Sequence, residues 1–185
     1  YLRTHGAEAV AFELVVASGA NAAMPHARPG PRRIEPQEPI VVDIGARYQG
    51  YNSDLTRTFW IGEPLEQFQR IHRLVMDAQE AAEEGIRAGM TGREADAIAR
   101  QLIAEAGHER EFGHGLGHGV GLAIHESPRL SSRSEDTLEA GNVATVEPGI
   151  YLPGWGGVRI EDIVVVQEEG VRVLTRATKI PWIGA

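Results

Sequence analysis

The chain has 185 residues, 42% of them hydrophobic and 24% charged, which is the composition of one folded soluble domain. Acidic residues outnumber basic ones by 26 to 18, and the net charge of −8 argues against a protein that binds nucleic acid or an anionic membrane. The absence of cysteine excludes disulfides, thiolate metal sites and cysteine nucleophiles. No apolar run approaches the ~18 residues of a membrane span, and a cytoplasmic location is the default expectation.

The first third of the chain is predicted to form strands around a long loop. A strand is expected at Ala9–Ser18, which is rich in Val, Phe, Leu and Ala. Five prolines make Asn21–Pro39 a loop, because proline is poorly tolerated inside regular elements. Two more strands follow at Ile40–Arg47 and Ser53–Ile61, joined by a turn at Tyr48–Tyr51.

Two helices are predicted in the middle of the chain. Pro64 stands where a first helical residue would, and apolar residues repeat at helical spacing from there to about Arg87. Thr91–Glu94 has the form of a capping box, so a second helix begins there and ends at Gly107. Strands follow at Asn142–Glu147, Val158–Gln167 and Val171–Leu174. Helices grouped between pairs of strands favour an α+β domain over a parallel βαβ one.

The first predicted hairpin carries an aspartate on each arm, Asp43 and Asp54. A turn centred between Gln49 and Gly50 places residue 43 opposite residue 56 and residue 45 opposite residue 54. The two aspartates are then diagonal neighbours, about 7–8 Å apart at the backbone.

The second predicted hairpin carries a glutamate on each arm, Glu147 and Glu161, at equal distances from Gly154. Folding the chain about Gly154 sets the two glutamates directly opposite each other on one face, with their Cβ atoms roughly 5 Å apart.

Paired acids on a hairpin have a simple alternative interpretation, which is that they lie on a solvated face. Like charges directly opposite each other destabilise a sheet, however, and these acids lie within apolar segments that look buried. Lys and Arg are scarce in the same segments. A metal ion is therefore the more economical partner for the four carboxylates.

In the segment Gly113–Gly121 every second residue is glycine, and His114 and His118 occupy two of the positions between the glycines. So much glycine rules out a stable helix, and in an extended chain the two histidines are about 13 Å apart. At most one of them is then a ligand to a given ion, which leaves the other for substrate contact or proton transfer. His125 could reach the same cleft, and a functional role for His26 in the proline-rich loop stays open.

Four carboxylates with one imidazole and no sulfur suit Mn²⁺, Co²⁺, Zn²⁺ or Fe²⁺. Four negative charges exceed what one ion needs and balance two divalent cations. Two ions about 3.5–4 Å apart can share an activated water and stabilise a hydrolytic transition state.

These motifs resemble those of the pita-bread metallopeptidases, the family that contains methionine aminopeptidase, aminopeptidase P and Xaa-Pro dipeptidase (prolidase). The resemblance implies an α+β fold with a pseudo-symmetric, curved antiparallel sheet backed by helices, and two ions in the central cleft. It also implies that Asp54 and Glu161 bridge the two ions. Asp43 would bind one ion, and His118 and Glu147 would hold the other. The five metal ligands carried over by motif are Asp43, Asp54, His118, Glu147 and Glu161.

The proline-specific branch of the family is favoured by Gly157–Asp162 and by His114–His118 followed by His125-Glu126. Methionine aminopeptidases differ before their last glutamate. Relatives in this branch usually carry a separate N-terminal domain and form dimers or tetramers, so a homodimer or tetramer is expected. Tyr1–Gly6 resembles the last turn of a helix closed by glycine, and residues 1–185 are interpreted as a catalytic domain without its N-terminal domain and first helix.

The implied activity is hydrolysis of the bond between an N-terminal residue and proline in dipeptides or short peptides, with Mn²⁺ as the expected metal and Co²⁺ or Zn²⁺ as alternatives. Glu147 is expected to act as general base and acid, and His125 to stabilise the oxyanion. His114 and His26 are expected to hold the substrate around its proline. Arg159 is expected to orient the carboxylate of Glu161 or to bind the C-terminus of the substrate.

Three alternatives remain. The first is a methionine aminopeptidase, which has the same chemistry and a different pocket. The second is a metal-free creatinase-type amidinohydrolase, and the third is a binding protein that keeps the fold without catalysis. The complete set of five ligands argues against the second and third alternatives.

Overall fold

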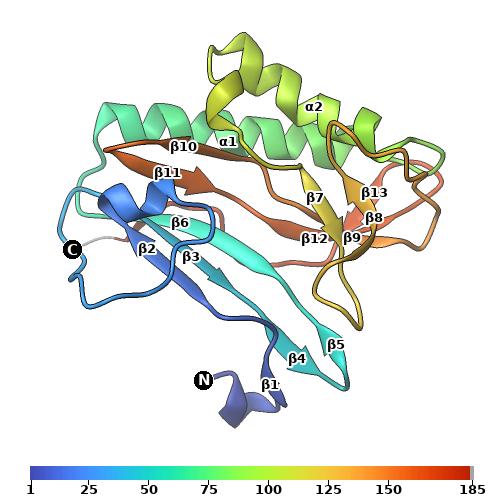
Figure 1. Ribbon diagram of the computed structural model, residues 1–185, viewed down its shortest axis with the longest axis horizontal. Coiled ribbons are helices and arrows are strands. Elements are labelled where there is room, and N and C mark those ends of the chain that lie inside the picture. Colours follow the sequence, from blue (N-terminus) through green and yellow to red (C-terminus); the bar gives the residue numbers. More distant parts are fainter. Residues whose placement is uncertain (184–185) are drawn as a thin grey trace.

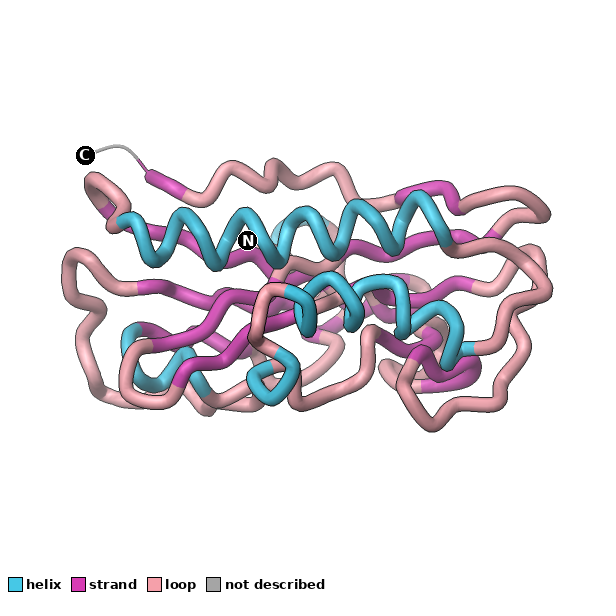
Figure 2. The backbone as a smooth tube through the Cα atoms, turned by 90° about the horizontal axis from the view of Figure 1, so that it is seen from above, coloured by secondary structure: helices cyan, strands magenta, loops and turns pink. Residues whose placement is uncertain are grey.

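The structure is a computed structural model that describes residues 1–183, and in it two α-helices cover one side of a set of curved strands (Figure 1). Figure 2 shows both helices lying across the strands on the same face. The helices are α1 (Glu66–Gly85) and α2 (Gly92–Glu105), with short 3-10 helices at Arg3–His5, Gly19–Ala23 and Glu109–Glu111. The strands are β1 (Ala9–Val10), β2 (Val15–Ser18), β3 (Pro39–Ile44), β4 (Ala46–Tyr48), β5 (Tyr51–Asn52), β6 (Leu55–Ile61), β7 (Gly117–Gly119), β8 (Glu126–Leu130), β9 (Val143–Val146), β10 (Gly149–Leu152), β11 (Gly156–Arg159), β12 (Asp162–Val166), β13 (Val171–Val173) and β14 (Trp182–Ile183).

Two main sheets form the body, in the strand orders β14-β6-β3-β2 and β13-β12-β9-β7-β8. Their strands pair antiparallel, apart from β14, which pairs parallel with β6. The sheets meet where β6 lies along residues 159–161, because the amide of Glu161 donates to the carbonyl of Thr56 at 3.1 Å. Thr58 Oγ1 likewise donates to the carbonyl of Arg159 at 2.9 Å. The two acid-bearing hairpins therefore share one seam, and the predicted α+β architecture is confirmed.

The hydrophobic core lies between the helices and the sheets. One face of α1 is fully buried, and its residues recur at intervals of three or four, as expected of an amphipathic helix. This face packs against apolar residues of α2 and of the strands beneath, including the fully buried Trp60. The buried α1 residues are Phe68, Ile71, Val75, Ala78 and Ala82.

The helix boundaries follow the sequence signals closely. The capping box is confirmed, because Thr91 Oγ1 accepts from the amide of Glu94 at 3.2 Å and Glu94 Oε2 accepts from the amide of Thr91 at 2.7 Å. Gly107 lies just past the second helix at φ +84, a left-handed conformation that suits glycine. The first helix begins at Glu66 rather than Pro64 and ends at Gly85 rather than Arg87.

Several predicted strands are interrupted. Ala9–Ser18 is two strands rather than one, and Ile40–Arg47 is broken at Gly45 into β3 and β4. A Cβ atom at Gly45 would lie 2.2 Å from the carbonyl oxygen of Ser53, so only glycine allows the chain to approach this closely. Ser53–Ile61 forms a single strand, β6, that begins at Leu55, while β5 (Tyr51–Asn52) lies just before it, where a turn was predicted.

The C-terminal half differs from the prediction in a similar way. Val158–Gln167 is split into β11 and β12 around residues 160–161, and strands β7, β8, β10 and β14 were not predicted. At the start of the chain the expected helical turn is a 3-10 turn closed by Gly6 at φ +99. Among the described residues, no helix is both long and apolar enough to cross a membrane.

Candidate metal centre

The first hairpin brings Asp43 and Asp54 into one cleft. Strands β3 and β6 pair Asp43 with Thr56 and Ile44 with Leu55, so the predicted register is correct. Asp54 lies directly before β6, two residues from Thr56 on the same face of the chain. The diagonal relation of the two aspartates therefore follows from the position of the turn.

The second hairpin sets Glu147 opposite Glu161, also in the predicted register. Val146 pairs with Asp162 on one side of them, and Gly149 pairs with Arg159 on the other. The glutamates themselves do not exchange backbone hydrogen bonds. The amide of Glu147 donates to the carbonyl of Leu116 at 2.8 Å, and the amide of Glu161 to that of Thr56. Neighbouring segments therefore hold both glutamate backbones in place.

His118 in β7 is the histidine that reaches the acids. Its Nε2 atom lies 3.2 Å from Glu147 Oε1 and 3.7 Å from Asp54 Oδ2. Its Nδ1 atom is 3.0 Å from the carbonyl oxygen of Gly119, which orients the ring so that Nε2 faces the carboxylates. The ring of His114 lies elsewhere, with Nε2 2.8 Å from Tyr151 Oη. Only one of the two histidines is thus placed as a ligand.

Ligand atoms of Asp54, His118 and Glu161 lie within 4.8 Å of one another, close enough to hold one metal ion. Asp43 and Glu147 line the same cleft. Asp43 Oδ1 is buried and has no hydrogen-bond partner among the described residues. A buried oxygen without a partner is costly, and a cation at this point would satisfy it. The donor set of carboxylates and one imidazole therefore fits divalent metal ions.

The electrostatics of the protein alone show how strongly the cluster lacks positive charge. Burial, together with the charges of Asp43 and Glu147, raises the pKa of Asp54 to about 8. Burial and the neighbouring acids also raise the pKa of Glu161 well above its usual value. Burial is the largest single influence on Glu147 and disfavours its ionisation, but the hydrogen bond to His118 and the charges of His118, His114 and Arg159 together outweigh it and lower the pKa of Glu147 to about 2.

Two threonine hydroxyls support the acids and were missed by sequence reasoning. Thr56 Oγ1 donates to Glu161 Oε2 at 2.7 Å, and Thr145 Oγ1 donates to Glu147 Oε1 at 2.9 Å. Thr145 lies two residues before Glu147, and Thr56 two residues after Asp54, so each shares a strand face with an acid. This separation of two residues from a candidate ligand was the sequence signal that could have identified both threonines.

Arg159 is buried beside the cluster, although its partner differs from the expected one. Its Nη2 atom donates to Asp43 Oδ2 at 2.7 Å, whereas no hydrogen bond joins its side chain to the carboxylate of Glu161 among the described residues. Its Nη1 atom donates to Tyr151 Oη at 2.9 Å, and Tyr151 in turn contacts His114. Tyr151 was not predicted, since an aromatic residue in an apolar strand is usually a core residue. Arg159 is thus placed to orient Asp43.

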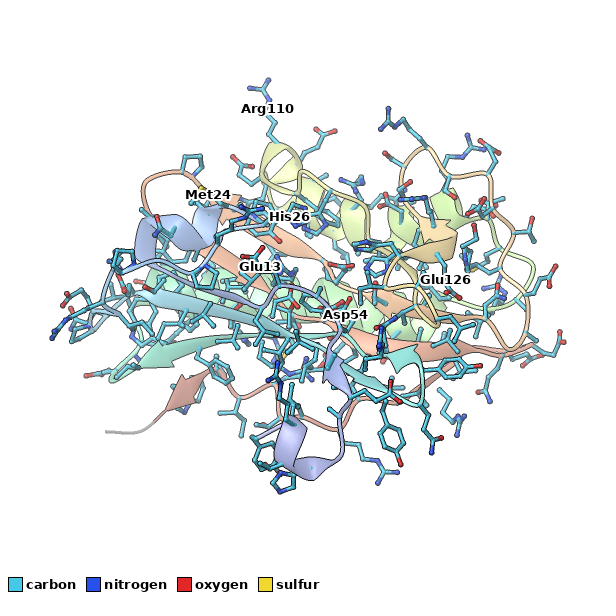
Figure 3. All side chains as sticks on the ribbon, turned by 60° about the horizontal axis from the view of Figure 1, so that its bottom comes forward. Glu13, Met24, His26, Asp54, Arg110 and Glu126 are labelled. Atoms are coloured by element: carbon cyan, nitrogen blue, oxygen red, sulfur yellow. The ribbon has the colours of Figure 1, made fainter. Side chains whose placement is uncertain are left out.

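The cluster opens into a cleft of about 660 Å³. His26 and His125 both line it, as does His114. The ring of His125 packs edge-on against that of His118, with centroids 4.3 Å apart. Figure 3 shows His26 and Glu13 beside the central region that holds Asp54. All the candidate residues named from the sequence therefore border one cavity.

Comparisons with known proteins agree with this geometry. The model of the family described as metallopeptidase family M24 matches residues 1–168. The Xaa-Pro dipeptidase of Pyrococcus furiosus is 47% identical over 178 residues, which are 96% of this chain and 51% of that protein.

Two solved structures are similarly close. The Xaa-Pro dipeptidase from Bacillus anthracis superposes with a TM-score of 0.96 at 47% identity, covering 98% of this chain and 51% of that one. The X-Pro aminopeptidase from Thermotoga maritima gives a TM-score of 0.95 at 44% identity, covering 99% and 52%. The chain spans about half the length of the relatives that it matches.

Proposed function

Because the chain belongs to metallopeptidase family M24 and has its pita-bread fold, we propose that the protein hydrolyses the peptide bond between an N-terminal residue and proline. The main support for this proposal is that five side chains able to bind metal converge on one cleft from both hairpins and β7. The names of similar proteins support proline as the second residue of the substrate. Residues 1–185 are proposed to form the catalytic domain.

The five side chains and the family support binding of divalent metal. We propose two ions, with Asp54 and Glu161 shared between them. Asp43 would bind one ion, and His118 and Glu147 the other. Oxygen donors with a single imidazole suit Mn²⁺, which is the proposed metal, while Co²⁺ and Zn²⁺ remain to be tested. When bound, paired divalent ions polarise a carbonyl group and make a water molecule more acidic.

Glu147 is proposed to move the proton of the reaction. Its contacts to Thr145 and His118 are made by Oε1, so Oε2 is assigned the proton transfer. Glu147 takes a proton from the attacking water as the new carbon–oxygen bond forms. It then returns the proton to the proline nitrogen as the carbon–nitrogen bond breaks.

Three histidines are proposed to contact the substrate. His125 lies beside His118, and burial lowers the pKa of His125, so a neutral ring donates a hydrogen bond to the developing oxyanion. His114 and His26 border the part of the cleft assigned to proline. A prolyl bond offers no N–H group, so the shape of this pocket must provide the selection.

We propose assembly into a homodimer or tetramer, on the precedent of the family, and a cytoplasmic location as the default for such a domain. Light scattering on the full-length protein measures the first, and a mass of one chain would contradict it. Fractionation of cells measures the second.

The proposed activity is tested by assaying the full-length protein on Xaa-Pro dipeptides, Xaa-Pro-Yaa tripeptides and a Met-Ala peptide. Each assay is run with Mn²⁺, after chelation, and after Mn²⁺ is restored. We expect cleavage at prolyl bonds alone, lost on chelation and recovered with the metal. The two peptide lengths separate a dipeptidase from an aminopeptidase. Cleavage of Met-Ala alone would contradict the proposal.

A further inference from the structure

The glycine-rich segment before β7 carries His114 and leads to His118, yet its own side chains do little to fix its backbone. Gly115 and Gly117 are required sterically, because a Cβ atom would lie 2.7 Å from the carbonyl oxygen of Leu130 at Gly115 and 2.0 Å from that of Thr145 at Gly117. Glycine loses more backbone freedom on folding than any other residue. Contacts from outside the segment must therefore hold the histidine in position.

Arg100 of α2 supplies such contacts. Figure 1 shows α2 above the segment that leads into β7. Nη1 of Arg100 donates to the carbonyl of Phe112 at 2.9 Å, and Nη2 donates to the carbonyl of His114 itself at 2.6 Å. The guanidinium group also lies over the Phe112 ring, 4.2 Å from its centroid. One side chain thus holds two carbonyls that flank the peptide unit of Gly113.

Asp96, one helical turn earlier, completes the arrangement. Its carboxylate is 1% exposed and accepts from Arg100 Nε at 2.6 Å and Nη2 at 2.8 Å. Oδ1 also accepts from the amide of Leu116 at 2.9 Å. The carbonyl of Leu116 in turn accepts from the amide of Glu147 at 2.8 Å. A continuous set of hydrogen bonds therefore runs from α2 to the backbones of His114 and Glu147.

Neither Asp96 nor Arg100 lines the cleft. We propose that this pair is a positioning device, which fixes the glycine-rich backbone so that the His114 ring meets the proline of the substrate. The assignment of His114 to the substrate rests on the proposed function, whereas the immobilisation of residues 112–117 does not. An ion pair that only stabilised α2 would have no reason to direct two of its donors to carbonyls of this segment.

The test compares Arg100→Met, Arg100→Lys and Arg93→Met in the full-length protein with Mn²⁺. Methionine keeps the apolar contact with Phe112 and removes the donors, while lysine keeps the charge without the two-point contact. Arg93 is the matched control, because it lies on the same helix and pairs with Glu135 at the exposed surface. Amide hydrogen exchange and steady-state kinetics on a prolyl dipeptide are measured for each variant.

In Arg100→Met we expect exchange to rise more at residues 112–117, the Leu116 amide in particular, than in the rest of the chain. We expect KM to rise about tenfold, because small misplacements of the groups that hold a substrate reduce enzymatic efficiency by this factor or more. The value of kcat should change less. Arg100→Lys should fall in between, and Arg93→Met should match the wild type. Adding His114→Ala to Arg100→Met should cost less than the sum of the two single effects, because both act through one ring.

Unchanged exchange at residues 112–117 would overturn the proposal, as would a rise spread evenly over the chain. Fully additive effects of the two substitutions would also overturn it. If the exchange result is as expected while the wild-type protein cleaves no prolyl bond, the positioning device stands and the proposed function fails.

Discussion

Two clusters of buried charge lie back to back in this molecule, and they differ in charge balance. Glu161 lines the cleft, whereas Asp162, the first residue of β12, accepts a hydrogen bond from Gln79 of α1 at 2.9 Å and so belongs to a cluster under α1. In the cluster under α1, Asp162 bonds to Arg57 Nη2 at 2.7 Å and lies 3.0 Å from Lys179 Nζ. Lys179 also pairs with Glu83 at 3.3 Å. Two acids thus face two bases.

The cleft cluster has no such balance. Its four carboxylates face one guanidinium, that of Arg159, and the imidazole of His118. Burial and the neighbouring acids raise the pKa of Asp54 to about 8, and burial raises the pKa of Glu83 to about 7 in the other cluster, so the two clusters differ in their count of basic groups rather than in the direction of these shifts. A charge-balanced buried cluster thus stabilises the fold, whereas a buried cluster that lacks positive charge is suited to binding cations from outside the protein.

The largest effect is expected from Glu161→Gln, which tests the cleft side of the comparison. Glutamine keeps the shape and removes one of the shared carboxylates, so hydrolysis of a prolyl substrate should fall to background. The metal-free variant should unfold at no lower urea concentration than the metal-free wild type, because burial already disfavours the charge of Glu161. Kinetics and urea titration measure the two quantities. A variant that stays active would show that Glu161 binds no essential ion.

Asp162→Asn is the matched substitution one residue away, and it tests the other cluster. Removing this carboxylate leaves the buried Arg57 without an acidic partner and Lys179 with Glu83 alone, so the free energy of unfolding should fall by about 3–5 kcal/mol. Metal content of the folded variant should stay close to that of the wild type. Equal stability, or loss of metal without loss of stability, would contradict the assignment of Asp162 to a structural role.

The next effect concerns pH and His72, which is 5% exposed on α1. Burial and the nearby charge of Arg57 lower the pKa of His72 to about 4. Between about pH 6.5 and pH 4 the unfolded chain binds a proton that the folded chain does not, so stability falls as the pH decreases through this window. The loss amounts to about 3 kcal/mol for this group and is absent above pH 6.5.

His72→Leu should remove that part of the acid sensitivity. Urea titrations of wild type and variant at pH 7, 5.5 and 4 measure it. Parallel stability curves for the two proteins would show that His72 does not carry the effect.

The smallest effect is expected from Thr56→Val, which removes the hydroxyl that supports Glu161 and leaves the ligands in place. Loss of a supporting hydrogen bond at a metal ligand costs about 10–100-fold in metal affinity or activity. Competition with a fluorescent chelator measures the affinity for Mn²⁺. Thr137→Val, at a position outside the cleft lining, serves as the control and should not change the affinity.

The sequence predicted the pairing of the acids because hairpin register depends on turn position. The turns around Gly50 and Gly154 fix which residues face each other, and positive φ at both glycines is consistent with tight turns. The same reasoning could not show that the two strands lack backbone hydrogen bonds to each other at Glu147 and Glu161. Their absence depends on the neighbouring segments at Leu116 and Thr56, which are far away in the sequence.

The residues that sequence reasoning missed act through tertiary contacts. Tyr151, Thr145 and Arg100 stand in segments whose patterns indicate an ordinary strand or helix, and only the folded chain brings them to the site. Strand β7 was missed because Gly117–Gly119 has two glycines, which have low strand propensity. Its place in the sheet depends on pairing with β8 and β9.

The division between a cation-binding cluster and a structural cluster is tested by the number of Mn²⁺ ions bound per chain in the full-length protein, its Glu161→Gln variant and its Asp162→Asn variant. The measurement uses metal analysis after removal of free ions. We expect two ions in the wild type, fewer than two in Glu161→Gln and two in Asp162→Asn. Equal loss of metal in both variants, or no bound Mn²⁺ in the wild type, would contradict the division between a cation-binding cluster and a structural one.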